Sequence, residues 1–245
     1  MQQPSAIEVG RLSATDDVIV RIEGLTRVYR QDTVAVHALG GIDLEVRRAD
    51  FAVLVGPSGS GKTTLLNMIG GLDSPTAGRV WVAGDEIGGM SRAQLSEMRL
   101  RRIGFVFQEF NLIPVLSALE NVEFVMLLQG RPAAQRRARS LALLKELGLE
   151  GMEHRRPSEL SGGQQQRVAV ARAIAAEPAI VLPDEPTANL DSKAGAALMD
   201  LMRRLNDEQG ITFVFSTHDP MVVERARRVI RLRDGRIESD ERRPG

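Results

Sequence analysis

Short apolar runs alternate along this chain with longer segments whose apolar residues recur at the spacing of a helix. Runs that are apolar almost throughout, as in strands buried on both faces, lie at residues 51–55, 179–182 and 211–217. Helical spacing predicts helices at residues 62–70, 163–176 and 192–210 and a helical stretch at 117–148 in which Pro132 marks a new helix start. Buried strands that alternate with helices predict an α/β fold with a mostly parallel core sheet.

The remaining patterns predict shorter strands and one helical insert. Strands are expected at residues 18–30, 33–39, 41–46 and 103–108, in a hairpin at 78–87 that turns at Gly84 and Asp85, and around Asp234 and Gly235. Residues from about 95 to 157 are largely helical and interrupt the alternation, so we expect an inserted helical subdomain. The predicted organisation is a flexible N-terminal tail at 1–17, one domain at 18–240 and a C-terminal tail at 241–245.

Composition narrows the class of protein. The 245 residues include 32 Lys and Arg and 32 Asp and Glu, and zero net charge argues against nucleic-acid binding, which favours a basic excess. The chain has no Cys, which excludes disulfides and thiolate metal sites and fits a reducing compartment. It lacks the pattern of a secretory signal and any run of roughly 18 apolar residues, so a membrane role is expected only through a partner.

The first glycine-rich loop, GPSGSGKTT, directly follows the apolar run at 51–55 and satisfies the phosphate-loop pattern G-x-x-x-x-G-K-[ST]. Glycines let the backbone approach phosphate oxygens, and N–H groups at a helix start supply partial positive charge. Lys62 is expected to reach the β- and γ-phosphates of a nucleotide and Thr63 to offer its hydroxyl to Mg²⁺. The predicted binding residues are Gly56, Pro57, Ser58, Gly59, Ser60, Gly61, Lys62, Thr63 and Thr64.

Two adjacent carboxylates, Asp184 and Glu185, follow the apolar run at 179–182. Ligand groups in open α/β sheets gather at that end of the strands, and carboxylates in apolar surroundings are costly unless they are used. Asp184 is predicted to hold Mg²⁺, directly or through water, and Glu185 to orient or deprotonate an attacking water. The ordinary alternative is a solvated acidic turn.

Three single residues are further candidates, although each alone has an ordinary structural explanation. Gln108 ends a predicted strand, and its amide is able to contact Mg²⁺ or water. His218 ends another strand and is placed to donate to a γ-phosphate. Tyr29 is the only Tyr in the chain and is a candidate for stacking on a base.

A second glycine-rich helix start, LSGGQ, begins at Leu160. Ser161 with Gln164 three residues later matches a capping box, which explains the helix start without any need for glycine. Each Gly in a first turn costs up to about 1 kcal/mol relative to Ala, so Gly162 and Gly163 indicate a close approach to the backbone. One nucleotide needs one phosphate cradle in its own chain, so we expect this cradle to serve a nucleotide held by another copy.

Together these motifs resemble, from about residue 18 to 238, the nucleotide-binding subunits of ABC transporters. GPSGSGKTT is similar to the family's Walker A loop, LSGGQ to its signature motif, and IVLPDE to its Walker B motif with the catalytic Glu185. Gln108 falls at the family's Q-loop position and Asp191 at its D-loop position. His218 falls at the position of the switch histidine and Tyr29 at that of the aromatic A-loop residue.

The resemblance implies a P-loop NTPase fold with a mostly parallel core sheet, an antiparallel β subdomain and an inserted α-helical subdomain. It implies ATP and Mg²⁺ as cofactors, with Thr63, Gln108 and Asp184 at the metal. Catalysis of ATP hydrolysis would fall to Glu185, His218 and Gln108. One departure is Pro183, where the family commonly has a small or aliphatic residue, because a proline removes a backbone donor next to Asp184.

The resemblance also implies partners. Two copies would form a head-to-tail dimer with two ATP molecules between them, each held by the Walker A loop of one copy and residues 161–164 of the other. Asp191 would lie across that interface. Integral membrane permease subunits would dock near Gln108 and the helical insert, which would hold the protein at the cytoplasmic face of the cell membrane.

Three longer stretches resemble more narrowly the lipoprotein-release and macrolide-export branch, whose permeases are of a four-span type. They are GGLDSPTAGRVWVAG, IGFVFQEFNLIPVLSALENVE and LSGGQQQRVAVARA. The alternative is a signalling ATPase of the cell-division type, which transmits motion without moving a substrate. A single cassette without a long coiled-coil insert counts against a soluble translation or DNA-repair ATPase.

Overall fold

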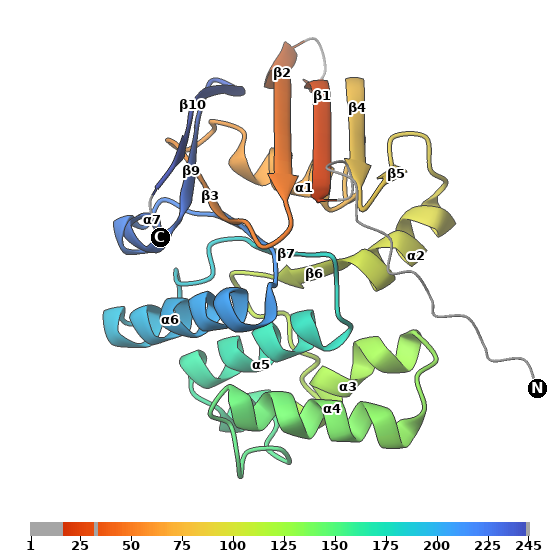
Figure 1. Ribbon diagram of the computed structural model, residues 1–245, viewed down its shortest axis with the longest axis vertical. Coiled ribbons are helices and arrows are strands. Elements are labelled where there is room, and N and C mark those ends of the chain that lie inside the picture. The colour runs from red at the N-terminus through yellow and green to blue at the C-terminus, as the bar shows by residue number, and fades with distance from the viewer. Residues whose placement is uncertain (1–16, 32–33, 244–245) are drawn as a thin grey trace, which may run out of the picture.

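A computed structural model describes residues 17–31 and 34–243, so residues 1–16 of the predicted N-terminal tail lie outside the described part. The described strands form two sheets (Figure 1). An antiparallel sheet has the order β2-β1-β4-β5, with β1 (Val18–Gln31), β2 (Val34–Arg47), β4 (Ala77–Val82) and β5 (Asp85–Glu86). The main sheet has the order β10-β9-β3-β8-β7-β6.

All neighbours in the main sheet pair in parallel, apart from the antiparallel edge strand β10. Its strands are β3 (Phe51–Val55), β6 (Ile103–Val106), β7 (Ile180–Pro183), β8 (Phe213–Ser216), β9 (Arg228–Arg233) and β10 (Arg236–Arg242). Alternate side chains of β3 enter two separate cores, Phe51, Val53 and Val55 in one and Ala52 and Leu54 in the other. The main sheet is therefore covered on both faces, as its uninterrupted apolar strands predict.

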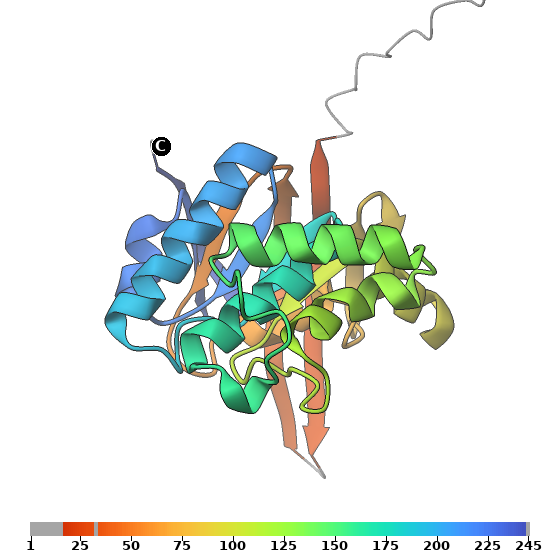
Figure 2. The same cartoon turned by 90° about the horizontal axis from the view of Figure 1, so that it is seen from below.

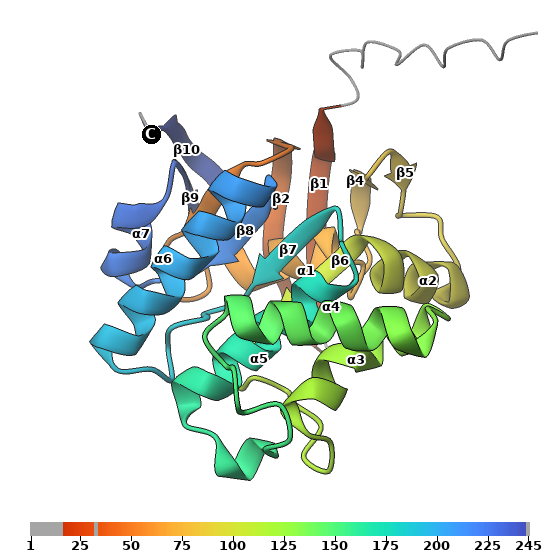
Figure 3. The ribbon, with the colours of Figure 1, turned by 60° about the horizontal axis from the view of Figure 1, so that its bottom comes forward.

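Helices of the described chain lie on opposite sides of this sheet. Helix α1 (Lys62–Ile69) packs in the core that includes the antiparallel sheet. The other core holds α3 (Ala118–Leu128), α4 (Ala133–Glu146), α5 (Gly162–Ala175) and α6 (Ser192–Gln209). In Figure 3 these four helices lie in front of the main sheet and α1 lies behind it, and Figure 2 shows the same layer from below. The two glycine-rich helix starts, on α1 and α5, are therefore separated by the sheet.

Two predicted strands prove to be one. Residues 33–39 and 41–46 were expected as separate strands, but β2 is continuous through Gly40 and Gly41. Leu25 pairs with Ile42 and the next residue of β1 pairs with Gly40, so Gly41, at φ 90°, is a bulge. The glycines fail to break the strand because the long β1 continues to pair on both sides of the bulge.

Other differences from the expected elements are smaller. The hairpin turn lies at Ala83 and Gly84, since Val82 pairs with Asp85. Helix α2 (Arg92–Arg102), the 3-10 turn η1 (Pro157–Glu159) and α7 (Pro220–Arg225) were not predicted as separate elements. Strand β6 lies within the range 95–157 and pairs with β7, so that range contributes a strand to the main sheet as well as helices. Strand β10 extends to Arg242, inside the range predicted as a C-terminal tail.

A buried ion-pair network fixes the start of β3, the strand that leads into the first glycine loop. Arg228 and Asp50 are 5% and 8% exposed, and an Arg228 Nη1 donates to Asp50 Oδ2 at 2.8 Å. Arg228 also donates to both carboxylate oxygens of Asp240, and Arg242 donates to Asp50 Oδ1 at 2.9 Å. Burial alone would lower the pKa of Arg228, but Asp240 and Asp50 overcome it and raise the pKa above its ordinary value.

We predict that Asp50→Asn lowers the free energy of unfolding by about 3 kcal/mol, because it leaves Arg228 buried without one of its charged partners. Denaturant titration with a structural probe measures this. Glu97→Gln is the matched control, since Glu97 pairs with Arg101 on the surface and exposed pairs contribute at most about 1 kcal/mol. An Asp50→Asn loss no larger than that of the control would contradict a stabilising role for the network.

Candidate active site

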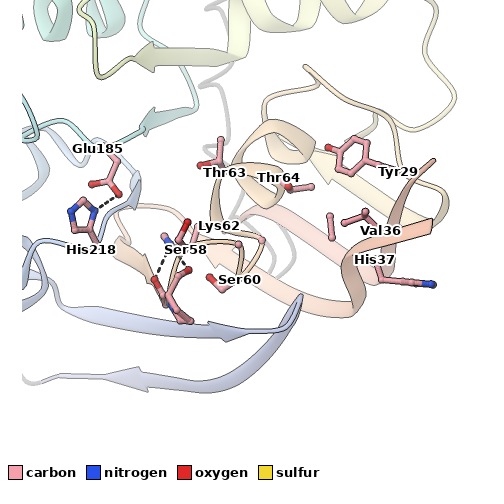
Figure 4. A pocket seen from close by; sticks show the side chains of 15 residues that line it. Tyr29, Val36, His37, Ser58, Ser60, Lys62, Thr63, Thr64, Glu185 and His218 are labelled. Atoms are coloured by element: carbon pink, nitrogen blue, oxygen red, sulfur yellow. Dashed lines mark hydrogen bonds and ion pairs between the residues drawn. The ribbon is translucent and has the colours of Figure 1, made fainter. Parts of the chain in front are cut away.

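The first glycine loop leaves the carboxyl end of β3 and enters α1 at Lys62. A Cβ at Gly56 would lie 2.2 Å from the carbonyl oxygen of Leu232, and one at Gly61 would lie 2.6 Å from that of Ala38. Both glycines have positive φ, 155° and 99°, so close backbone approach and conformation exclude other residues there. Lys62 Nζ donates to the carbonyls of Gly56 at 2.8 Å and Pro57 at 3.1 Å, which holds it over the loop (Figure 4).

A cavity of about 670 Å³ opens above this loop. It is lined by residues 56–64, by Tyr29, Val36, His37 and Ala38 of the antiparallel sheet, and by Glu185 and His218. Tyr29 lies at the opposite side of the pocket from Glu185 and His218 (Figure 4). No side chain caps the first turn of α1, whereas serines cap α2, α3 and α5. The free amides of α1 therefore face a cavity large enough for a nucleotide, as a phosphate site requires.

Thr63, which lines this cavity, meets Asp184, which lies 121 residues away in sequence and is not itself part of the lining. Thr63 Oγ1 lies 3.5 Å from Asp184 Oδ1. A hydroxyl and a carboxylate are oxygen donors of the kind that Mg²⁺ prefers. The described residues contain no cluster of three or more metal-binding side chains, and Mg²⁺ bound with substrate phosphates usually takes only one or two protein carboxylates. The pair therefore fits a magnesium ion that the phosphates help to hold.

Burial raises the pKa of Asp184, and the Glu185 carboxylate raises it further against the opposing effects of Ser216, Thr63 and Lys62. A carboxyl whose pKa is higher in the folded state contributes its full stabilisation below its unfolded pKa, and this stabilisation is lost as pH rises through the folded pKa. Ionised Asp184 therefore opposes folding at neutral pH when no cation is bound.

We predict that Asp184→Asn raises the melting temperature of the nucleotide-free and magnesium-free protein, with a larger increase near pH 8 than near pH 5. Thermal unfolding followed by circular dichroism at both pH values measures the difference. Asp85→Asn, at an exposed position of β5, is the control and should change little at either pH. An equal or smaller increase at the higher pH would contradict the assignment.

Glu185 and His218 lie together at the carboxyl ends of β7 and β8. His218 Nδ1 is 2.8 Å from Glu185 Oε1 (Figure 4), and Thr217 Oγ1 donates to Glu185 Oε2 at 3.0 Å. The side chain of Glu185 is 18% exposed, whereas that of His218 is 76% exposed. A carboxylate held at the edge of a phosphate-binding cavity is placed to act on water that attacks a phosphate.

Pro183 is the last residue of β7, which has neighbours on both sides. Val181 N donates to the main-chain oxygen of Thr212, directly before β8, and Glu185 N donates to that of Ser216 on β8, each at 2.8 Å. Pro183 lies midway between these donors, where its missing N–H interrupts the ladder. Pairing resumes at the Asp184–Ser216 bridge, so both carboxylate residues remain in register despite the proline.

Tyr29 is held by two residues that the sequence did not indicate. Its hydroxyl donates to Asp73 Oδ2 at 2.6 Å, and the Arg27 guanidinium lies 4.4 Å from its ring centre. Arg27 also pairs with Asp73 Oδ1 at 2.7 Å. Because Asp73 lies 44 residues from Tyr29, no short-range pattern in the sequence identifies this tether.

The second glycine loop does not line the cavity. Ser161 caps α5 by accepting from Gln164 N, and Gln164 Oε1 accepts from Ser161 N at 2.9 Å, so the predicted capping box is present. A Cβ at Gly162 or Gly163 would make only ordinary contacts, at 3.5 Å or more, and neither residue has positive φ. Nothing in the described part of the chain therefore requires glycine at these positions.

Asp191 and Gln108 are also absent from the cavity lining. Asp191 caps α6 through a 2.8 Å hydrogen bond from Ala194 N. Gln108 lies in the loop after β6 with an exposed side chain, and its carbonyl accepts from Asn189 Nδ2 at 2.9 Å. The described chain thus brings together the residues predicted at 29, 56–64, 184, 185 and 218, and leaves those at 108, 161–164 and 191 outside the cavity.

Comparison with known proteins gives the family. The sequence model described as ABC transporter matches residues 39–188, more than half of the chain, including both glycine loops and the two carboxylates. The chain belongs to the ABC transporter family. It is an ABC ATPase with the mixed, mostly parallel sheet, antiparallel β subdomain and helical region of ABC nucleotide-binding domains, as the sequence predicted.

Relatives of this ABC chain include two named systems. It is 46% identical to the lipoprotein-releasing system ATP-binding protein LolD 1 of Rhodopseudomonas palustris, over 89% of this chain and 98% of that protein. It is 46% identical to the macrolide export ATP-binding/permease protein MacB of Brucella melitensis, over 91% of this chain but 34% of that protein. The dimeric post-hydrolysis structure of the ATP-binding cassette MJ0796 of Methanocaldococcus jannaschii, bound to ADP and Pi, has a TM-score of 0.84 at 43% identity, over 92% of this chain and 99% of that one.

Proposed function

We propose that this ABC ATPase drives a membrane permease of the lipoprotein-release or macrolide-export type, and that it acts as a head-to-tail dimer. Each ATP lies in the cavity of one copy and is completed by residues 161–164 of the partner subunit. The observation that supports this most directly is that nothing among residues 17–31 and 34–243 requires glycine at 162 and 163. Two glycines without a role in this described part of the chain indicate close approach by another molecule, and a helix start attracts phosphate.

Within each site the side chains divide the work of ATP hydrolysis. Tyr29 stacks on the adenine, residues 56–64 surround the phosphates, and Lys62 turns from its carbonyl contacts to the β- and γ-phosphates. Thr63, Asp184 and Gln108 would hold Mg²⁺, which would supply charge neutralisation at the phosphates. Glu185 orients and deprotonates water, His218 donates to the γ-phosphate, and Asp191 contacts the other copy across the interface.

The proposed partner is the subunit that spans the membrane. None of the described helices has both the length and the apolar character needed to cross a bilayer. Docking of the permease near Gln108 and the helical region would hold the ATPase at the cytoplasmic face of the membrane. The similarity to both lipoprotein-release and macrolide-export ATPases over about nine-tenths of the chain favours this branch.

Purification of the tagged chain from detergent-extracted membranes, followed by mass spectrometry, tests the proposal. The expected partner is a four-span permease with a large extracytoplasmic domain, and the reconstituted complex should hydrolyse ATP faster when a transported substrate is present. If the complex with the permease hydrolyses ATP at a rate that no substrate changes, the signalling function is favoured instead. Association only with ribosomes or DNA would contradict both functions.

A further inference from the structure

The carboxylate of Glu185 is held by two neighbours of very different rigidity. Glu185 has a left-handed backbone, at φ 47°, and its amide donates to the carbonyl of Ser216 at 2.8 Å. Its Oε1 atom contacts His218, whose side chain is 76% exposed and is therefore able to turn away. Its Oε2 atom accepts from Thr217, which is fully buried.

The hydroxyl of Thr217 points in a fixed direction. Thr217 N donates to the carbonyl of Leu54 at 3.2 Å, which ties this residue to β3 just before the phosphate loop. Thr217 Oγ1 accepts from Asp219 N at 3.0 Å, so its own proton is left for Glu185. Because a β-branched side chain has few rotamers, burial and these two contacts leave the hydroxyl little freedom.

We propose that Thr217 is a positioning residue for ATP hydrolysis, holding Glu185 by Oε2 so that Oε1 faces the cavity. This inference rests on the proposed role of Glu185 in deprotonating water. When His218 turns to the γ-phosphate, the Thr217 contact remains and Oε1 is free to accept a proton from the attacking water. Thr217 keeps its own proton throughout, so its contribution is orientation.

Three features of the geometry require such a support. A glutamate side chain has several rotatable bonds, and a catalytic group that is free to rotate spends little time in a productive orientation. Glu185 makes its other side-chain contact to an exposed residue. Thr217 bonds both to Glu185 and to Leu54 of β3, so the carboxylate and the phosphate loop are held by the same strand.

The test compares Thr217→Val with Thr217→Ser in the full-length protein at saturating Mg-ATP. Valine keeps the shape but removes the hydroxyl, and kcat is expected to fall about tenfold while KM for ATP changes less than about twofold, because the lost contact acts on chemistry rather than on binding. Serine restores the hydroxyl and most of the rate. If valine prevents folding, the same comparison is made between alanine and serine.

Thr212→Val is the matched control. Thr212 directly precedes β8, is 2% exposed and accepts a hydrogen bond from Ala49 N at 3.0 Å, but the hydroxyl has no contact with Glu185 among the described residues. It should lower thermal stability as Thr217→Val does and leave kcat unchanged. A kcat for Thr217→Val equal to that of Thr212→Val would overturn the proposal.

A double mutant separates positioning from general structural damage. In a Glu185→Gln background, Thr217→Val should lower the residual hydrolysis no further, because residues that act as a unit are not additive. A second tenfold loss in that background would show that Thr217 acts independently of Glu185 and would reject the inference. Native-rate hydrolysis by Glu185→Gln itself would instead reject the proposed role of Glu185.

Discussion

Glu185→Gln is expected to bind ATP with nearly native affinity and to lose roughly 100- to 10,000-fold in kcat, the range that general-base catalysis contributes. The amide matches the carboxylate in shape, so the 2.8 Å and 3.0 Å contacts with His218 and Thr217 have a partner of similar size, but an amide does not accept the proton of water. Because hydrolysis then no longer opens the dimer, the variant should accumulate as an ATP-bound dimer. Steady-state hydrolysis, nucleotide titration and size-exclusion chromatography with ATP measure the three effects.

The control is Glu208→Gln, which removes an exposed carboxylate near the end of α6 that does not line the cavity. It should hydrolyse ATP at the native rate and show the same oligomeric state as the native protein in size-exclusion chromatography with ATP. Glu185 would be removed from the mechanism if its glutamine variant kept more than about a tenth of the native rate, since that loss is smaller than a general base contributes.

The second large effect is recovery of activity in mixed dimers. Lys62→Ala removes the cation of the phosphate loop, and Gly162→Asp puts a carboxylate at the second cradle, so each homodimer should be inactive. In a mixed dimer, sharing between copies puts both lesions in one site and leaves the other site intact. Random exchange gives half mixed dimers, so the mixture should hold about a quarter of the native number of complete sites.

The structure makes this experiment informative. A Cβ at Gly162 would meet Asn189 O at 3.6 Å and Phe110 at 3.8 Å, which are ordinary contacts, so Gly162→Asp should fold normally. A loss of activity in this variant would then be caused by the effect of the new carboxylate on the nucleotide site of the partner subunit, not by misfolding. A verified mixed dimer without recovery would contradict sharing between the two copies.

A matched mixture uses Lys62→Ala with Glu185→Gln. Both residues line the same cavity, so each site of this mixed dimer carries one lesion and no site is complete. No recovery is expected here, whereas recovery is expected with Gly162→Asp. Recovery in both mixtures would show that one of the lesions is incomplete, whereas recovery only with Gly162→Asp would show that the two copies share each site.

The local parts of the site could be predicted because their signals lie within a few residues. The first loop needs glycine for backbone approach and positive φ, and the same residues that satisfy the motif start α1. The capping box of Ser161 and Gln164 is likewise recognisable from four consecutive residues. Placement of Asp184 and Glu185 at a strand end followed from one apolar run, since buried strands of α/β sheets present their ligands at that end.

The parts that could not be predicted depend on pairing between distant segments. Gly40 and Gly41 resemble a break, but the continuous partner β1 turns them into a bulge. Tyr29 is fixed by Asp73, and Glu185 by Thr217, through side-chain hydrogen bonds across 44 and 32 residues. Such contacts leave no periodic pattern in the sequence, because each depends on a single pair of atoms brought together by the fold.

The family, the α/β alternation and the phosphate loop could all be recognised in the amino-acid sequence, because they depend on backbone requirements and burial that short stretches of residues express. The tertiary structure was needed to show that Thr63 and Asp184 meet at 3.5 Å, since the strand order puts β8 between β3 and β7 and brings the carboxyl ends of these strands to one edge. It also decided that α1 and α5 lie on opposite sides of the main sheet, as their packing in separate cores requires. Long-range strand pairing, which no short stretch of residues encodes, is the physical reason for both.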